Sequence, residues 1–214
     1  MIAMGGSASA SISLGPINDF QGGTVEGWIS GFPNPNPPTL ISNGGPLGAG
    51  DGFLHIASTG GFGAGSKLVS FNTGSDWIGD YVSAGVTAIL ADVNNLGSTS
   101  LDIRIRLDGP GGTFVSAVPV ALSPGSGWQP AAFSLDPSDL TGGANVLATL
   151  AAVSQVRLLH NPAATATGPA LVGSLGADNL AAIPEPSTGI LLVCGAGVAA
   201  LGRWRARLRW VCGA

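Results

Sequence analysis

The chain has 214 residues, of which 45% are hydrophobic and only 9% charged, a composition opposite to that of a disordered protein. The formal net charge is −4, yet four of the eight basic residues are arginines close to the C-terminus. The rest of the chain is therefore acidic, which excludes a nucleic-acid-binding domain that relies on clustered Lys and Arg. Both cysteines, Cys194 and Cys212, also lie near the C-terminus, so the preceding residues hold no disulfide among themselves.

The first ten residues are interpreted as the remnant of a secretion signal. Residues 7–10, Ser-Ala-Ser-Ala, fit the small-x-small pattern of a cleavage site. The charged and apolar segments that normally precede such a site are missing, so we expect the true start to lie further upstream. The alternative is a flexible N-terminus without a targeting role.

Residues 11–182 consist of short apolar runs separated by Gly- and Pro-rich turns, a pattern typical of strands joined by turns. In chain order, strands are predicted over 52–57, 67–71, 82–93, 101–108, 113–120, 129–135, 155–160 and 176–182, with one short helix over 146–153. The clearest strand is 101–108, where aliphatic and charged side chains alternate and therefore lie on opposite faces. With the turn at 108–112 it predicts a hairpin to 113–120. Because helices do not alternate with strands, the predicted fold class is all-β, an antiparallel β-sandwich.

Aromatic side chains are the first candidates for contacting a ligand. The apolar face of a sugar ring packs on an aromatic ring, so Trp77, Tyr81 and Trp128 are candidate polysaccharide contacts. Trp128 follows a Ser-Pro-Gly-Ser-Gly turn, which favours exposure. The alternative is that these rings fill the core of the sandwich, where each buries a large area.

The charged face of residues 101–108 is the second candidate. Arg104 and Arg106 lie on it between Asp102 and Asp108, and we consider them for binding an acidic polysaccharide. The alternative is a solvated face whose charges pair across strands. No motif of a serine hydrolase, a zinc protease or a phosphate-binding loop occurs, and Glu26 is the only glutamate between residues 11 and 182. We therefore expect no enzyme activity.

The order of several short motifs carries a resemblance. They are Asp19-Phe20, Gly27-Trp28, residues 52–56 (Gly-Phe-Leu-His-Ile), residues 77–81 (Trp-Ile-Gly-Asp-Tyr), Gly127-Trp128 and residues 176–180 (Gly-Ala-Asp-Asn-Leu). In this order they resemble the jelly-roll domains of the galactose-binding and carbohydrate-binding-module type, and also the laminin-B type of extracellular domain. The resemblance implies that the first and last strands are neighbours and hold a structural calcium, for which Asp19 and Asp178 are the candidate ligands. The alternative is that Asp178 starts a turn and Asp19 is solvated.

Residues 183–214 form a separate tail. Pro184, Glu185 and Pro186 precede an apolar run over 189–201, and a basic cluster follows, made of Arg203, Arg205, Arg207 and Arg209. This order resembles the PEP-CTERM sorting signal. The resemblance implies a single short membrane helix with the arginines on the cytoplasmic side, and processing by an exosortase-type membrane protease. The alternative is a buried amphipathic helix that belongs to the domain.

Together these features predict an exported, non-catalytic protein of a Gram-negative bacterium. It would be anchored transiently in the inner membrane through the tail and then reach the outer surface or the extracellular matrix, with exopolysaccharide as a candidate partner. The alternatives are a structural matrix protein without a specific ligand and a polysaccharide-modifying enzyme, which would need two close carboxylates in a cleft. Neither a nucleic acid nor a cofactor other than calcium is predicted.

Overall fold

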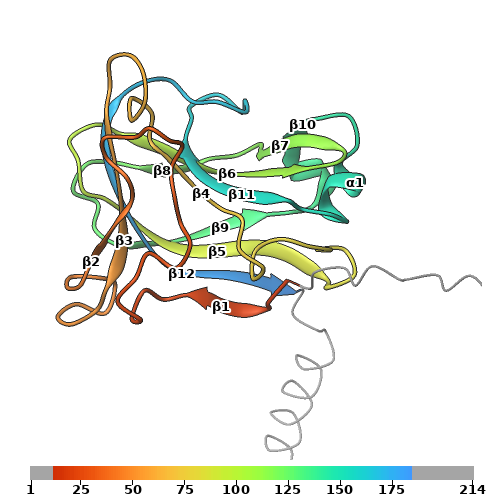
Figure 1. Cartoon of the computed structure of the whole chain (residues 1–214), viewed down its shortest axis with the longest axis horizontal. Helices are drawn as coiled ribbons and strands as arrows, with labels where there is room; N and C mark the ends of the chain where they lie inside the picture. Colours follow the sequence, from red (N-terminus) through yellow and green to blue (C-terminus); the bar gives the residue numbers. More distant parts are fainter. Residues whose placement is uncertain (1–11, 185–214) are drawn as a thin grey trace, which may run out of the picture. The chain divides into compact units, whose positions relative to one another are not determined.

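Two antiparallel sheets of six strands pack face to face in the computed structural model, which describes residues 12–184 (Figure 1). Sheet A contains β1 (Gly15–Asn18), β2 (Thr39–Ile41), β3 (Phe53–Thr59), β5 (Val86–Asn95), β9 (Gln129–Ser134) and β12 (Val172–Pro184). Sheet B contains β4 (Val69–Asn72), β6 (Leu101–Gly109), β7 (Gly112–Ser116), β8 (Val120–Leu122), β10 (Leu140–Gly142) and β11 (Gln155–His160). A 3-10 turn (Pro137–Asp139) and the helix α1 (Val146–Leu150) are the helical elements of these residues.

The strand order confirms the predicted antiparallel sandwich. Sheet A runs β2-β3-β12-β5-β9 with β1 beside β12, and sheet B runs β10-β7-β6-β11-β4 with β8 beside β6. The chain alternates between the sheets from β3 to β6, so most neighbouring strands are distant in sequence, and only β2–β3 and β6–β7 are consecutive pairs. The first and last strands pair as predicted, with Gly15 opposite Ala182.

The core lies between the sheets and follows the period of two in the strands. In β6 the aliphatic side chains of Leu101, Ile103, Ile105 and Leu107 are at most 1% exposed and point inward. Full burial of such a side chain contributes roughly 1.5–3 kcal/mol, so this strand alone stabilises the sandwich substantially. The described residues belong to one compact unit.

Two tryptophans and one tyrosine are among the largest side chains of this core. Trp28 and Trp77 meet edge to face with 5.8 Å between ring centroids, and both indole N–H groups donate to Oδ1 of Asn18, at 2.8 and 2.7 Å. The hydroxyl of Tyr81 donates to the carbonyl oxygen of Trp77 at 2.7 Å. Trp77 and Tyr81 are each 1% exposed. The prediction that these two side chains contact a ligand is therefore wrong, because both fill the core.

Several predicted boundaries also change. The strand predicted over 82–93 begins only at Val86, because the preceding residues form a turn in which the Ala84 N–H donates to the carbonyl of Asp80. The strand predicted over 113–120 is interrupted after Ser116 and continues as β8, which pairs with the same neighbour, β6. The predicted helix is confirmed as α1, and Asn145 caps it by accepting from the Ala148 N–H.

The two ends of the chain lie outside the described residues. These are the predicted signal remnant and the tail beyond Pro184, with Glu185, Pro186 and the four arginines. The predicted membrane helix falls in that tail. Within residues 12–184 no helix has the length and apolar character needed to cross a membrane.

Candidate functional site

A groove runs from the outer face of sheet B at the edge strand β4 onto the neighbouring segment 25–38. It consists of adjoining pockets of about 250, 300 and 170 Å³. The first two share the lining residues Ser30, Gly31, Phe32 and Asn34, and the last two share Lys67, Val69 and Arg157. Because each pocket continues into the next, we treat them as one site and call it the β4 groove.

The strand register explains which side chains form the floor of the β4 groove. Lys67, Val69 and Phe71 point to one side because their neighbours Leu68 and Ser70 are buried in the sandwich. Phe71 lies opposite Arg157 on β11. Arg157 in turn lies opposite Arg106 on β6. One cross-strand row thus places an aromatic ring and two guanidinium groups side by side.

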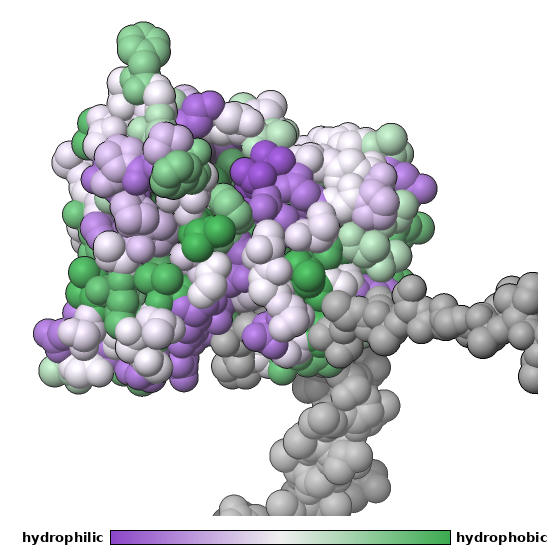
Figure 2. Space-filling model, viewed as in Figure 1, coloured by the Kyte–Doolittle hydropathy of each residue, from purple (hydrophilic) through white to green (hydrophobic). Residues whose placement is uncertain are grey.

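Two loops form the walls. A bridge between Ile29 and Phe71 fixes the start of the loop 30–38 against β4, and this loop carries Phe32, whose side chain is 99% exposed. On the other side, the segment 161–168 accepts hydrogen bonds from two arginines of β6. Figure 2 shows a strongly hydrophilic patch over sheet B with hydrophobic side chains beside it, a mixture suited to a ligand with both polar and apolar surface.

Arg104 holds this second loop in place. Its guanidinium donates to the carbonyl oxygens of Asn161 and Pro162 at 2.7 and 3.0 Å, and to those of Ser116 and Ala117 at 2.6 and 2.8 Å. The side chain is buried although it points away from the core, because the segment 161–162 covers it. The prediction that Arg104 binds a polysaccharide is therefore wrong, since its donors are engaged with the backbone.

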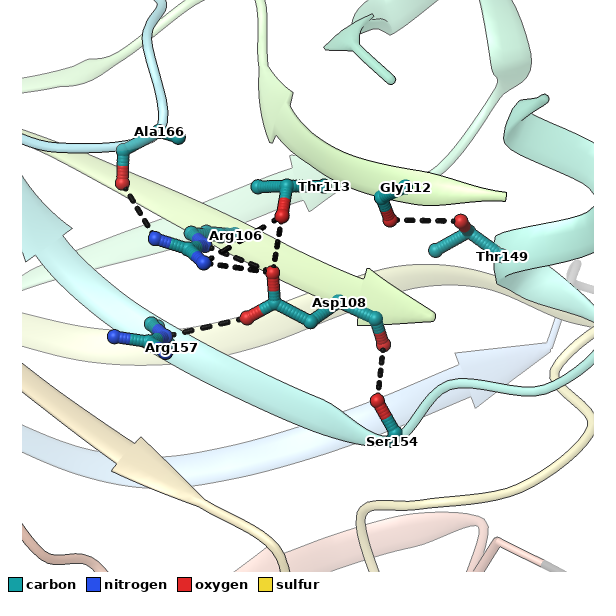
Figure 3. Close-up of polar contacts among 8 residues, drawn as sticks. All are labelled: Arg106, Asp108, Gly112, Thr113, Thr149, Ser154, Arg157 and Ala166. Carbon is teal, nitrogen blue, oxygen red and sulfur yellow. Dashed lines mark hydrogen bonds and ion pairs between the residues drawn. The ribbon is translucent and has the colours of Figure 1, made fainter. Parts of the chain in front are cut away.

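Asp108 organises the two arginines that remain accessible (Figure 3). Its Oδ1 accepts from Nε and the Nη2 amine of Arg106 at 3.1 and 2.8 Å, and its Oδ2 accepts from Nε of Arg157 at 3.2 Å. Both guanidinium groups lie on the same side of the carboxylate in Figure 3. Burial opposes ionisation of Asp108, but hydrogen bonds from Arg106 and Thr113 and the two arginine charges hold its pKa below the ordinary value.

Arg157 is the more available of the two. The Nη1 amine of Arg106 also donates to the carbonyl of Ala166 at 2.8 Å. Within the described residues, Arg157 donates only through Nε, while its guanidinium lies over the ring of Phe71 with Cζ 5.2 Å from the centroid. The Asp108 contact and the ring therefore fix the side chain and leave its two terminal amines available.

Trp128 lies on the other sheet, at the start of β9. Its indole N–H donates to the carbonyl of Gly44 at 2.9 Å, and its ring meets Phe53 edge to face at 5.1 Å. The side chain is half-buried, so it remains a candidate contact. The predicted ligand residues are thus not brought together: Arg106 lines the β4 groove, Trp128 lies on the outer face of sheet A, and the others are buried.

Of the two predicted calcium ligands, Asp19 is exposed, and its charge acts on the buried carboxylate of Asp178. Asp178 is 1% exposed, and Oδ2 of its carboxylate has no hydrogen-bond partner. Burial raises its pKa to about 7, and the nearby charges of Asp51, Asp92 and Asp19 act in the same direction. Within residues 12–184, however, no group of three His, Cys, Asp or Glu side chains is placed to hold a metal ion. A calcium ion here would need backbone or water oxygens, and the site stays a prediction.

The two sheets and their strand order define the class of the domain as a jelly-roll type of β-sandwich. Its structure is similar to that of a family 11 carbohydrate-binding module from a cellulosomal cellulase of Clostridium thermocellum, with a TM-score of 0.52 and 14% identity over 82% of this chain and 96% of that one. It is also similar to the carbohydrate-binding module CBM28, described as specific for non-crystalline cellulose, with a TM-score of 0.53 and 10% identity over 83% and 98%.

A third similar structure is an exo-β-agarase, with a TM-score of 0.59 and 14% identity over 81% of this chain. The chain spans only 26% of that enzyme. No protein-family profile matches the sequence, and no curated protein is similar to it. At these identities the likeness concerns the fold alone.

Sequence reasoning missed most of the β4 groove. Phe32, Lys67, Phe71 and Arg157 line it, and none was a candidate. The outward direction of Arg157 could have been found from the period of two in 155–160, where Val156 and Leu158 are inward. Its position beside Phe71 depends on the pairing of β11 with β4, which the pattern does not contain.

Proposed function

We propose that residues 12–184 form a non-catalytic polysaccharide-binding module and that the β4 groove is its binding site. The observation that carries this proposal is the continuity of the pockets from β4 onto the segment 25–38, where the exposed Phe32 lines two of them. A polymer needs an extended groove, and a sugar ring offers both an apolar face for aromatic rings and hydroxyl groups for polar side chains. Asn34, Ser30 and Arg157 supply the polar contacts.

A binding role is favoured over hydrolysis by the lining of the groove. Glycoside hydrolysis ordinarily needs a pair of carboxylates about 5–9.5 Å apart. None of the residues that line the three pockets is acidic, and the carboxylate of Asp108, which contacts two of the lining arginines, is paired with them. The similar carbohydrate-binding modules are consistent with this reading, although they support it only through their fold.

The setting of the module is a proposal from the sequence. The order of Pro184-Glu185-Pro186, apolar run and arginines supports export, sorting by an exosortase-type protease and a final place at the cell surface or in the matrix. Exopolysaccharide would then be the polymer that the module meets and binds. A structural matrix protein without a ligand is the competing function, and it is favoured by the low charge of the chain.

Affinity electrophoresis tests the binding proposal. The full chain, kept in a non-ionic detergent, is run in gels with and without hydroxyethyl cellulose, agarose or the producing organism's exopolysaccharide. We expect retardation by at least one polymer, and Phe32→Ala should weaken it. Phe62→Ala is the matched control, because this phenylalanine is equally exposed but does not line the groove. Loss of binding with Trp128→Ala instead would move the site to sheet A, and no retardation by any polymer would favour the structural role.

A further inference from the structure

Charge is distributed unevenly over the module. Residues 12–184 hold four basic side chains, against all but one of the 12 acidic side chains in the chain. Three of the four basic ones, Lys67, Arg106 and Arg157, line the β4 groove. The three pockets have no acidic lining residue. On an acidic body this groove is therefore the place where positive charge gathers.

Ion pairs within the module do not neutralise all of this positive charge. Asp108 is the only carboxylate that pairs with these groups in the described part of the chain, and it neutralises one of three cations. Lys67 is exposed and makes no hydrogen bond or ion pair among residues 12–184. The terminal amines of Arg157 have no acceptor there.

The arrangement of Arg157 suits a planar or tetrahedral anion. A guanidinium group binds carboxylate or sulfate oxygens through two parallel N–H donors. The binding is tighter when the side chain is already held in place before the anion arrives. The bond from Nε to Asp108 and the ring of Phe71 provide that fixation. Lys67 lines the same two pockets and adds a second, mobile charge.

We propose that the β4 groove selects an anionic polysaccharide, one whose sugar units carry carboxylate or sulfate groups, and that Lys67 and Arg157 bind the anionic group. This inference rests on the proposed function, because it names the ligand class of the same groove. Phe32 and Asn34 would contact the sugar ring beside the anionic group. The negative charge elsewhere on the module would repel such a polymer from other faces, which orients it toward the groove.

Three polymers with one backbone test the proposal: hydroxyethyl cellulose (neutral), carboxymethyl cellulose (carboxylate) and cellulose sulfate. The dissociation constant of the full chain in non-ionic detergent is measured for each polymer at low and high salt. We expect tighter binding of one or both charged polymers, and weakening of that binding by salt. The better of the two identifies the anionic group.

Substitutions in the groove test which side chains bind the anionic group. Arg157→Gln and Lys67→Gln should each weaken binding of the charged polymer roughly ten- to a hundredfold, the range for a charged hydrogen bond. Gln129→Glu is the matched control, because it changes the net charge by the same amount on the exposed edge of sheet A. Unchanged thermal unfolding shows that each variant is folded.

The outcomes separate this inference from the proposed function. Equal affinity for the neutral and charged polymers, or equal effects of Gln129→Glu and Arg157→Gln, would overturn the charge selection. If Phe32→Ala weakened binding of the neutral polymer in that case, the binding role of the groove would stand. Absence of binding to all three polymers would also overturn the charge selection. The proposed function would then be tested by comparing the binding of the wild type and of Phe32→Ala to the native exopolysaccharide.

Discussion

The buried carboxylate of Asp178 predicts that the module loses stability as the pH rises. The pKa of this group is raised by burial from 3.8 to about 7 in the folded state. At a pH between these two pKa values, the folded protein therefore keeps a proton that the unfolded chain has lost. The stabilisation that results is fully present below pH 3.8 and is lost as the pH rises through about 7. Linkage over a shift of about three units gives a total of about 4 kcal/mol, more than half of which falls between pH 5 and 8.

Other groups titrate in the same range, so the test is a difference between two proteins. Burial lowers the pKa of His55 and of His160, and their contributions therefore have the opposite sign. Asp178→Asn removes one titration and leaves these two unchanged. We expect the variant to gain about 2–3 kcal/mol relative to the wild type between pH 5 and 8, measured by urea unfolding followed by tryptophan fluorescence. Asp139→Asn, which removes an exposed carboxylate, is the matched control.

A constant difference between wild type and Asp178→Asn across this pH range would refute the reasoning. The same titration tests the calcium prediction at Asp19 and Asp178. Calcium that stabilises the wild type at pH 8 but not the variant would show that a cation replaces the proton. An equal effect of calcium on both proteins would leave the proton as the partner of the buried carboxylate.

The remaining predictions concern side chains that hold the fold together. Asn18→Ala leaves two buried indole N–H groups without their acceptor, and it should lower the free energy of unfolding by about 2–4 kcal/mol in the same urea assay. Arg104→Lys cannot reach four carbonyl oxygens and should cost about 2–4 kcal/mol; equal stability of the two proteins would contradict the role given to the guanidinium. Gly176→Ala would bring a methyl group within 2.9 Å of the Trp128 ring, so the tryptophan fluorescence of the folded protein should change. An unchanged spectrum would show that the added methyl group does not displace the ring.

The alternation of residues in the sequence was sufficient to predict the sandwich. In 101–108, the aliphatic residues had to share one face, and all of them lie in the core. The pairing of the first and last strands followed from the resemblance to jelly rolls, and the structure confirms it. The short strands β1, β2 and β10 were missed because three or four residues carry too little periodicity to be recognised.

The candidate site was harder to predict because it depends on neighbours that are distant in sequence. Arg104 and Arg106 occupy equivalent positions on one strand, yet one is buried by the segment 161–162 and the other lines the groove. The pattern of β6 cannot distinguish them. Trp77 and Trp128 are similarly alike in sequence, and only the packing around Asn18 shows that the first belongs to the core.

The pairing of β1 with β12 has a consequence for how the module can be attached to a larger structure. Gly15 lies opposite Ala182, so residues that enter and leave the domain do so at one place on sheet A. The β4 groove lies on the outer face of the other sheet. A tether at either end would therefore be attached to the sheet that does not carry β4. The same geometry means that a pull on both ends acts first on the pairing of Gly15 with Ala182, at a place where β12 is also held by β5.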